Sequence, residues 1–252
     1  MSEAELDDGP VVVKRGHAPG ATTAEAAGLR WLAEPAAVAV ARVRGHDDDW
    51  LVLERIDASR PTRDAAADFG RGLARLHAAG APAFGAPPPG GPVDAWIGSA
   101  PMRNVTGERW AEWYAAQRVL PYVRQAVDSG GLTAGEADVV ERACAAIPES
   151  PEPPARLHGD LWNGNVLWTA RGACLIDPAA HGGHRETDLA MLHLFGCPHL
   201  DDVVAAYDEC APLAPGWRER IPLHQLFPLL VHTVLFGRSY ARQAVAAART
   251  LL

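Results

Sequence analysis

Residues 157–191 read LHGDLWNGNVLWTARGACLIDPAAHGGHRETDLAM. Asp160 and Asn165 are five positions apart, and Asp177 follows a strand-turn-strand pattern over residues 166–176. If Asp160 lies on a tight loop, Asn165 ends that loop and Asp177 follows the returning strand, the three oxygen-bearing side chains meet in one small volume. Hard oxygen ligands of this kind suit Mg²⁺, which keeps the rest of its shell for water and phosphate.

The spacing of these polar residues is typical of kinases. There, the Asp of a D-x-x-x-x-N loop is the base, and the Asn and a later Asp at a strand end are metal ligands. Asp, Asn and Gly are also what any hairpin or loop would use, so the spacing alone leaves an ordinary turn open.

The flanking residues are more specific. HGDLWNGN at residues 158–165, followed by DPAAHGGHRETDLAM at residues 177–191, resembles the fructosamine kinase (ketosamine kinase) family. These are relatives of the aminoglycoside and choline kinases within the protein-kinase-like fold. Aminoglycoside kinases share the His-Gly-Asp, the Asn and the later Asp, but Leu-Trp-x-Gly and Asp-Pro-Ala look like fructosamine kinases.

The resemblance covers nearly the whole chain and implies an α+β fold with two lobes. A small antiparallel sheet lobe that binds nucleotide is expected over residues 1–56, and a larger, mainly helical lobe over residues 57–252. The second lobe would carry the catalytic loop, residues 157–165, and the metal-binding segment, residues 174–191.

Composition limits the class of protein further. With 252 residues, 48% of them hydrophobic, the chain can bury roughly three quarters of its unfolded surface. The net charge of −8 argues against a nucleic-acid partner, which would require a basic face. The four cysteines form no C-x-x-C pair, which indicates reduced residues of a cytoplasmic protein. The acidic N-terminus is no signal peptide, and the longest apolar run, residues 226–236, is too short to span a bilayer.

The N-terminal residues predict a hairpin over residues 4–13, with a turn at Asp7-Asp8-Gly9, that leads to Lys14. A lysine after a β-branched run is where a kinase lysine reaches the α- and β-phosphates, although an ordinary edge-strand lysine fits as well. Thr22 and Glu25 form a capping-box pattern at the start of a helix that runs to about residue 33. Glu25 either caps this helix or pairs with Lys14, and the resemblance favours the pair.

The next segments predict strands over residues 37–43 and 50–53. Their place in the pattern implies that the carbonyl of Glu54 and the amide of Ile56 bond the adenine edge of ATP. Helical spacing follows over residues 61–77.

Later residues predict a second capping box and a possible acceptor region. Thr133 and Glu136 form the capping box of a helix to about residue 147. A stripe of Trp110, Trp113 and Tyr114 is more typical of a core than of a substrate box. It nevertheless resembles the family insert that precedes the catalytic loop. Two positions depart from the family: Ala95 stands where Asn is usual and Met102 where Gln is common.

Five residues in or near the loop at residues 157–165 are considered for further roles. Trp162 has an aromatic face suited to stacking on a sugar, although packing of the loop is equally expected. His158 is expected to orient the loop, and the resemblance implies that Asp188 bonds its backbone amides. His181-Gly-Gly-His184 could be half of a zinc site, but the cysteines are not at ligand spacing.

The predicted reaction is phosphoryl transfer from ATP. Asp177 and Asn165 would hold Mg²⁺, Lys14 would add a cation, and Asp160 would accept the proton of the acceptor hydroxyl. The resemblance implies that the acceptor is the 3-hydroxyl of a fructosamine or ribulosamine, on a small molecule or a protein. The phosphorylated adduct then decomposes and releases the amine, which is deglycation.

One expected feature is missing. Only thirteen residues precede Lys14, so the first strand and the Gly-rich turn that covers the phosphates in such kinases are absent from the sequence. Either the chain is a truncated version of a normal enzyme, or the protein lacks this cover. Two alternatives therefore remain beside the ketosamine kinase: an aminoglycoside or other amino-sugar phosphotransferase, and a catalytically impaired nucleotide-binding protein.

Overall fold

The computed structural model describes residues 2–6 and 9–252. Near the N-terminus lies an antiparallel sheet with the strand order β1-β2-β5-β4. Its strands are β1 (Ser2–Leu6), β2 (Gly9–Arg15), β4 (Val43–His46) and β5 (Trp50–Glu54). The predicted first hairpin is present as β1 and β2, which pair from Ser2↔Val13 to Leu6↔Gly9. The Asp7 and Asp8 positions of its predicted turn lie outside the described residues.

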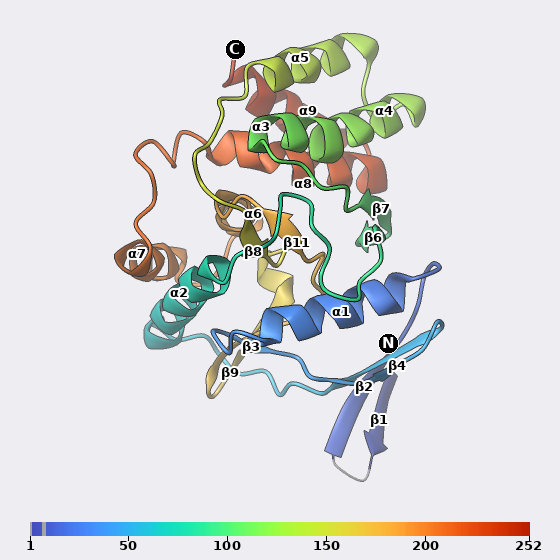
Figure 1. Cartoon of the computed structure of the whole chain (residues 1–252), viewed down its shortest axis with the longest axis vertical. Helices are drawn as coiled ribbons and strands as arrows, with labels where there is room; N and C mark the ends of the chain where they lie inside the picture. The colour runs from blue at the N-terminus through green and yellow to red at the C-terminus, as the bar shows by residue number, and fades with distance from the viewer. Residues whose placement is uncertain (1, 7–8) are drawn as a thin grey trace.

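Helix α1 (Ala21–Ala33) covers one face of this sheet (Figure 1). Ala26 and Leu29 of the helix pack with Leu51 and Leu53, alternate residues of β5 that point to the same face. The predicted capping box at Thr22 is wrong. The helix begins one residue earlier, after Gly20 in a left-handed conformation, so Thr22 already lies within its first turn, and its hydroxyl donates to the carbonyl of Asp47 at 2.7 Å.

The strand predicted over residues 37–43 is also different in the structure. It divides into β3 (Ala39–Val40) and β4, which belong to different sheets. β3 pairs in parallel with β10 (Gly172–Leu175), whereas β4 pairs with β5. The apolar run therefore connects the N-terminal sheet to the hairpin of β9 (Val166–Thr169) and β10, which precedes Asp177.

The rest of the described chain is mainly helical. Its longer helices are α2 (Arg63–Ala78), α4 (Leu120–Asp128), α5 (Ala134–Ala145), α6 (Glu186–Phe195), α7 (Leu200–Cys210), α8 (Ile221–Phe236) and α9 (Arg238–Arg249). They surround two apolar clusters: one joins α4, α5, α8 and α9, and the other joins α2, α7 and the β9–β10 hairpin. Figure 1 shows the first group farthest from the N-terminal sheet.

Two sequence predictions about these helices are confirmed by their local geometry. Thr133 and Glu136 form the predicted capping box at α5. The cap of α2, in which the Thr62 hydroxyl accepts from the amide of Ala65, is a feature that was not identified from the sequence. The aromatic stripe is core: Trp110, Trp113 and Tyr114, on α3 (Trp110–Trp113) and the following π-helical turn η1 (Tyr114–Val119), are buried. None of the helices in the described residues has the length and apolar character needed to cross a membrane.

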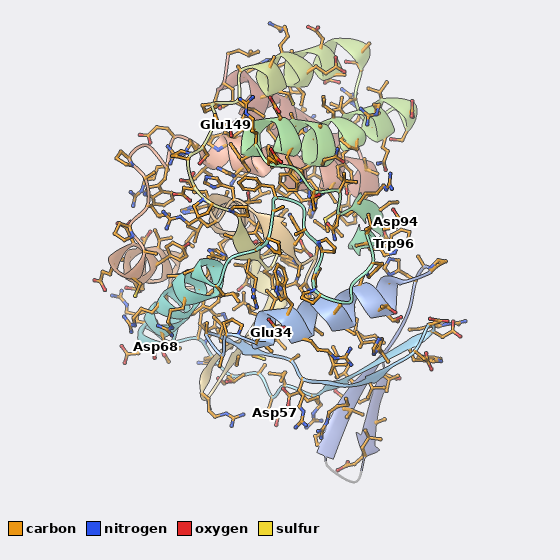
Figure 2. All side chains as sticks on the ribbon, in the orientation of Figure 1. Glu34, Asp57, Asp68, Asp94, Trp96 and Glu149 are labelled. Carbon is orange, nitrogen blue, oxygen red and sulfur yellow. The ribbon has the colours of Figure 1, made fainter. Side chains whose placement is uncertain are left out.

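Two short pairs of strands complete the region around the site. β8 (Ala155–Leu157) pairs antiparallel with β11 (His181–Gly183), which brings the residues before Asp160 beside the residues after Asp177. β6 (Asp94–Ile97) and β7 (Ala100–Arg103) form a hairpin near the start of α1, where Figure 2 labels Asp94 and Trp96. The architecture is a small antiparallel sheet beside a mainly helical body, as an α+β kinase-like fold predicts. The division of the chain at residue 56 stays a prediction.

Candidate active site

The three polar residues singled out in the sequence meet in the structure. Asp160 follows β8, Asn165 ends the 3₁₀ turn η2 (Asn163–Asn165), and Asp177 follows β10. The Asn165 Nδ2 donates to the Asp160 Oδ2 at 3.0 Å and to the Asp177 carbonyl at 3.3 Å. The side-chain oxygen of Asn165 and the carboxylate of Asp177 are oxygen donors of the kind that suits Mg²⁺.

A buried carboxylate supports the loop that carries Asp160. Asp188, on α6, accepts hydrogen bonds from the amides of His158 at 2.8 Å and Gly159 at 3.0 Å. His158 donates through Nε2 to the carbonyl of Ile176 at 2.9 Å and accepts at Nδ1 from the Asp160 amide. These bonds tie the loop to the segment that carries Asp177.

His77 is a further supporting residue that sequence reasoning missed. Its Nε2 donates to the Asp188 carboxylate at 3.2 Å, and its Nδ1 accepts from the Tyr207 hydroxyl at 2.8 Å. Burial alone would raise the pKa of Asp188, but the hydrogen bonds that its carboxylate accepts from His77 and the Gly159 amide outweigh burial and lower it. No local motif marks His77, because its partner is 111 positions away in the sequence.

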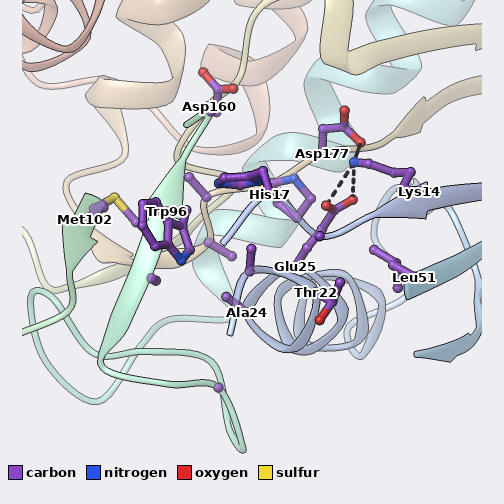
Figure 3. Close-up of a pocket in the computed structure, with 18 of the residues that line it drawn as sticks. Lys14, His17, Thr22, Ala24, Glu25, Leu51, Trp96, Met102, Asp160 and Asp177 are labelled. Carbon is purple, nitrogen blue, oxygen red and sulfur yellow. Dashed lines mark hydrogen bonds and ion pairs between the residues drawn. The ribbon is translucent and has the colours of Figure 1, made fainter. Parts of the chain in front are cut away.

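Lys14 lies between two carboxylates (Figure 3). Its ammonium donates to Glu25 at 2.7 and 2.9 Å and to Asp177 at 2.7 Å. Burial opposes the charge on Lys14, but Glu25 and Asp177 outweigh it and raise the pKa of the lysine. The structure therefore has Glu25 paired with Lys14 and not capping its own helix.

Asp160 has the electrostatic character of a general base. Burial raises the pKa of its carboxyl to about 7, against the hydrogen bond from Asn165 and with the support of the nearby Asp177 and Asp188 charges. A base with a pKa near the working pH combines a useful ionised fraction with a strong tendency to take a proton.

A cavity of about 350 Å³ adjoins these groups. Lys14, Glu25, Asp160, Asn165 and Asp177 line one part of it. The remaining lining comes mainly from the loop after β2, the start of α1, the β6–β7 hairpin and its flanks, and the loop that carries Asp160 and Trp162.

Trp162 lines this cavity, whereas the two residues predicted to contact adenine do not. Trp162 is 40% exposed and borders the cavity, and its ring meets Phe195 edge-on at 6.2 Å. Glu54 and Ile56 lie outside the lining of this cavity. The Glu54 carboxylate accepts from the amide of Arg42 at 3.0 Å. Their contact with adenine stays a prediction.

The β6–β7 hairpin supplies one wall of the cavity. Ala95 and Met102 are directly opposite each other in the hairpin and line the cavity. Trp96 donates from Nε1 to the carbonyl of Pro19 at 3.2 Å, and its ring meets His17 edge-on at 5.2 Å (Figure 3). The hairpin is thereby attached to the loop that follows Lys14.

His184, Glu186 and His224 form a second buried cluster, in which potential ligand atoms lie within 4.8 Å of one another. Arg220 already binds both oxygens of Glu186, at 2.6 and 2.8 Å. A divalent cation would add buried charge that these groups do not compensate. His181 is not part of this cluster, so the half zinc site considered from the sequence is not assembled.

A sheet lysine paired with a helix glutamate, facing a loop aspartate and an Asn–Asp pair, is typical of phosphotransferases with the protein-kinase-like fold. The present chain is an enzyme of this class. A ternary complex of an aminoglycoside phosphotransferase mutant with ADP and hygromycin B shares the fold, with a TM-score of 0.59 at 14% identity over 98% of this chain and 89% of that chain.

Closer relatives specify the family. The model of the fructosamine kinase family matches residues 10–252. A probable ketoamine kinase of Synechocystis is 33% identical over 226 residues, covering 88% of this chain and 75% of the relative. A crystal structure from Thermobifida fusca, provisionally named a fructosamine-3-kinase, has a TM-score of 0.92 at 53% identity and covers 99% of this chain and 88% of that chain. The chain belongs to the fructosamine kinase family.

Proposed function

We propose that this protein transfers the γ-phosphoryl group of ATP to a sugar hydroxyl of a ketosamine, such as a fructosamine or ribulosamine, and so starts its deglycation. The observation that carries the proposal is the meeting of Lys14, Asp160, Asn165 and Asp177 at one cavity. The family membership and the ketoamine kinase name of the Synechocystis relative support the choice of acceptor.

Each group has a separate task in the proposed reaction. Asp160 accepts the proton of the acceptor hydroxyl while the oxygen of that hydroxyl attacks the γ-phosphorus and ADP leaves. Lys14, held by Glu25, brings its ammonium toward the phosphates. Asn165 and Asp177 would hold Mg²⁺, which neutralises the charge that develops on the phosphate oxygens. Their carboxylate and amide oxygens fit this ion because it prefers hard oxygen donors.

The Asp160→Asn variant tests the base. Its turnover with ATP and fructosyl-glycine should fall by about 10²- to 10⁴-fold, because general-base help is typically of that size. ADP release measures the rate, and circular dichroism checks that the variant is folded. Near-normal turnover would remove Asp160 from the mechanism.

A substrate panel tests the acceptor. ADP release should be faster with fructosyl-glycine or ribulosyl-glycine than with amino-sugar antibiotics. The opposite preference would favour an amino-sugar phosphotransferase. Thermal stabilisation by ATP and Mg²⁺ without ADP release from any acceptor would favour a catalytically impaired nucleotide-binding protein.

A further inference from the structure

Asn104 carries an unpaired hydrogen-bond donor beside the cavity. It follows β7, its side chain is 2% exposed, and it belongs to the cavity lining. Its backbone amide donates to the carbonyl of Val93 at 2.7 Å. The side-chain Nδ2 is buried and has no hydrogen-bond partner among residues 2–6 and 9–252. A buried amide nitrogen without a partner is uncommon, since folded proteins satisfy most such groups.

Arg118 decides which way the amide of Asn104 points. The Arg118 Nη2 donates to the Asn104 Oδ1 at 2.8 Å. A guanidinium has only donors, so it binds the amide oxygen and cannot bind the amide nitrogen. The amide therefore cannot turn over without losing this bond, and its Nδ2 remains the free end.

Arg118 is itself held in one place. It is fully buried on the π-helical turn η1, a type of turn that is frequent at functional sites. Its Nη1 donates to the carbonyl of Arg103 at 2.8 Å, and its guanidinium lies 4.7 Å from the ring centre of Trp113. Its Nε donates to the Nε2 of His181. Within the described part of the chain, no carboxylate forms an ion pair with Arg118.

The buried charge of Arg118 makes Asn104 a stronger donor. Burial lowers the pKa of Arg118 to about 10, so the guanidinium remains charged at neutral pH. Its N–H group draws electron density toward the Asn104 oxygen, and linked hydrogen bonds of this kind polarise one another in a low-dielectric interior. The Nδ2–H of Asn104 is consequently suited to an oxygen that carries partial negative charge.

We propose that the Asn104 Nδ2 binds a carbonyl or hydroxyl oxygen of the acceptor sugar, and that Arg118 is the positioning residue that orients this amide. The inference rests on the proposed function, because Asp160 and Asn104 line the same cavity and the acceptor hydroxyl must lie at Asp160. Asn104 thus selects acceptors with a sugar oxygen beside the apolar wall of Ala95 and Met102.

The Asn104→Asp variant tests the donor with little change in packing. The carboxylate has the size of the amide and still accepts from Arg118, but it presents an oxygen where the Nδ2 was. The KM for fructosyl-glycine should rise at least about tenfold, the order expected for one lost hydrogen bond. The KM for ATP should not rise, and the Tm should not fall. Arg103→Gln is the matched control, because this neighbouring side chain is 68% exposed and outside the cavity lining.

Arg118→Lys tests the positioning role. The lysine keeps the charge but cannot donate to Asn104 and to the Arg103 carbonyl with the same fork geometry. The KM for fructosyl-glycine should rise by less than in Asn104→Asp, and the KM for ATP should stay constant. An equal rise in both KM values would show a general structural role and overturn the assignment of Arg118.

Acceptor analogues that each lack one sugar oxygen complete the test. Wild-type protein should lose about tenfold in kcat/KM with one of them, and Asn104→Asp should not distinguish this analogue from the parent ketosamine. If the wild type and Asn104→Asp discriminate equally against the analogue, or if the KM for fructosyl-glycine is unchanged in the variant, the role of Asn104 is overturned while the proposed function stands. A wild-type protein that phosphorylates no ketosamine overturns the proposed function and the inference with it.

Discussion

Lys14 is the residue whose contacts join the N-terminal sheet to the catalytic segment. Its ammonium bridges Glu25 on α1 and Asp177 after β10. The two carboxylates are brought near each other by the fold, and the lysine between them offsets their repulsion.

Asp160 illustrates a residue whose role opposes stability. Burial raises its pKa from 3.8 to about 7, so the folded protein favours the neutral acid. The contribution of Asp160 to stability should therefore fall as the pH rises from about 4 through 7, because the unfolded chain ionises Asp160 more readily than the folded one. Asp160→Asn has no such group to ionise.

The predicted result is that Asp160→Asn has a Tm at least about 2 °C above that of the wild type at pH 8, with the gap shrinking toward pH 4. Thermal unfolding in EDTA without nucleotide measures it. Asp57→Asn is the control, because Asp57 is 84% exposed. A Tm below that of the wild type at pH 8 would contradict the prediction.

At the scale of elements, α2 and α7 approach so closely that their backbones meet. A Cβ added at Gly70 would overlap the carbonyl oxygen of Val203. Gly135 in α5 is the opposite case, since a Cβ there would meet no atom within 4 Å. The two glycines have the same local propensity in a helix, but only Gly70 is required by packing.

Gly70→Ala should lower the free energy of unfolding by about 1–3 kcal/mol through overpacking. Gly135→Ala should raise it by up to about 1 kcal/mol, because alanine favours the helix more than glycine does. Urea denaturation of the wild type and both variants measures these changes in the free energy of unfolding. Equal effects of the same sign would show that the contact between α2 and α7 relaxes without difficulty.

For the whole molecule, Glu186 joins α6 to the start of α8. It begins α6, which carries Asp188, and it binds Arg220 at the start of α8. Burial raises the pKa of Glu186, but His224, whose Nε2 lies 3.3 Å from a carboxylate oxygen, and the two hydrogen bonds from Arg220 outweigh burial and lower it from 4.5 to about 2. Its ionised form therefore stabilises the fold above about pH 4.5, and this contribution is lost as the pH falls toward 2.

Glu186→Gln should lower the free energy of unfolding at pH 7 by about 3 kcal/mol, from about 1.4 kcal/mol for each pKa unit. The difference from the wild type should shrink below pH 4.5. Denaturant titrations at several pH values measure it, with the exposed Glu219→Gln as control. A difference that does not change with pH would place the effect in packing alone.

Local patterns predicted the features whose causes are local. The capping box of Thr133 and Glu136 lies at the helix start that the sequence indicates. The Asp160–Asn165 spacing spans one short loop, so its geometry depends on few other residues. The capping box at Thr22 failed because Glu25 had a second possible partner that lies outside its own helix.

By itself, the sequence determined the oxygen-rich chemistry of the Asp160–Asn165–Asp177 segment, the kinase-like fold and the family, because these depend on short motifs and regular spacing. Only the tertiary structure decided that Glu25 binds Lys14, that residues 37–43 divide between two sheets, and that Asn104, bound by Arg118, lines the cavity. The physical reason is that each of these outcomes depends on competition among groups from separate elements, and this competition is resolved only when the elements pack together.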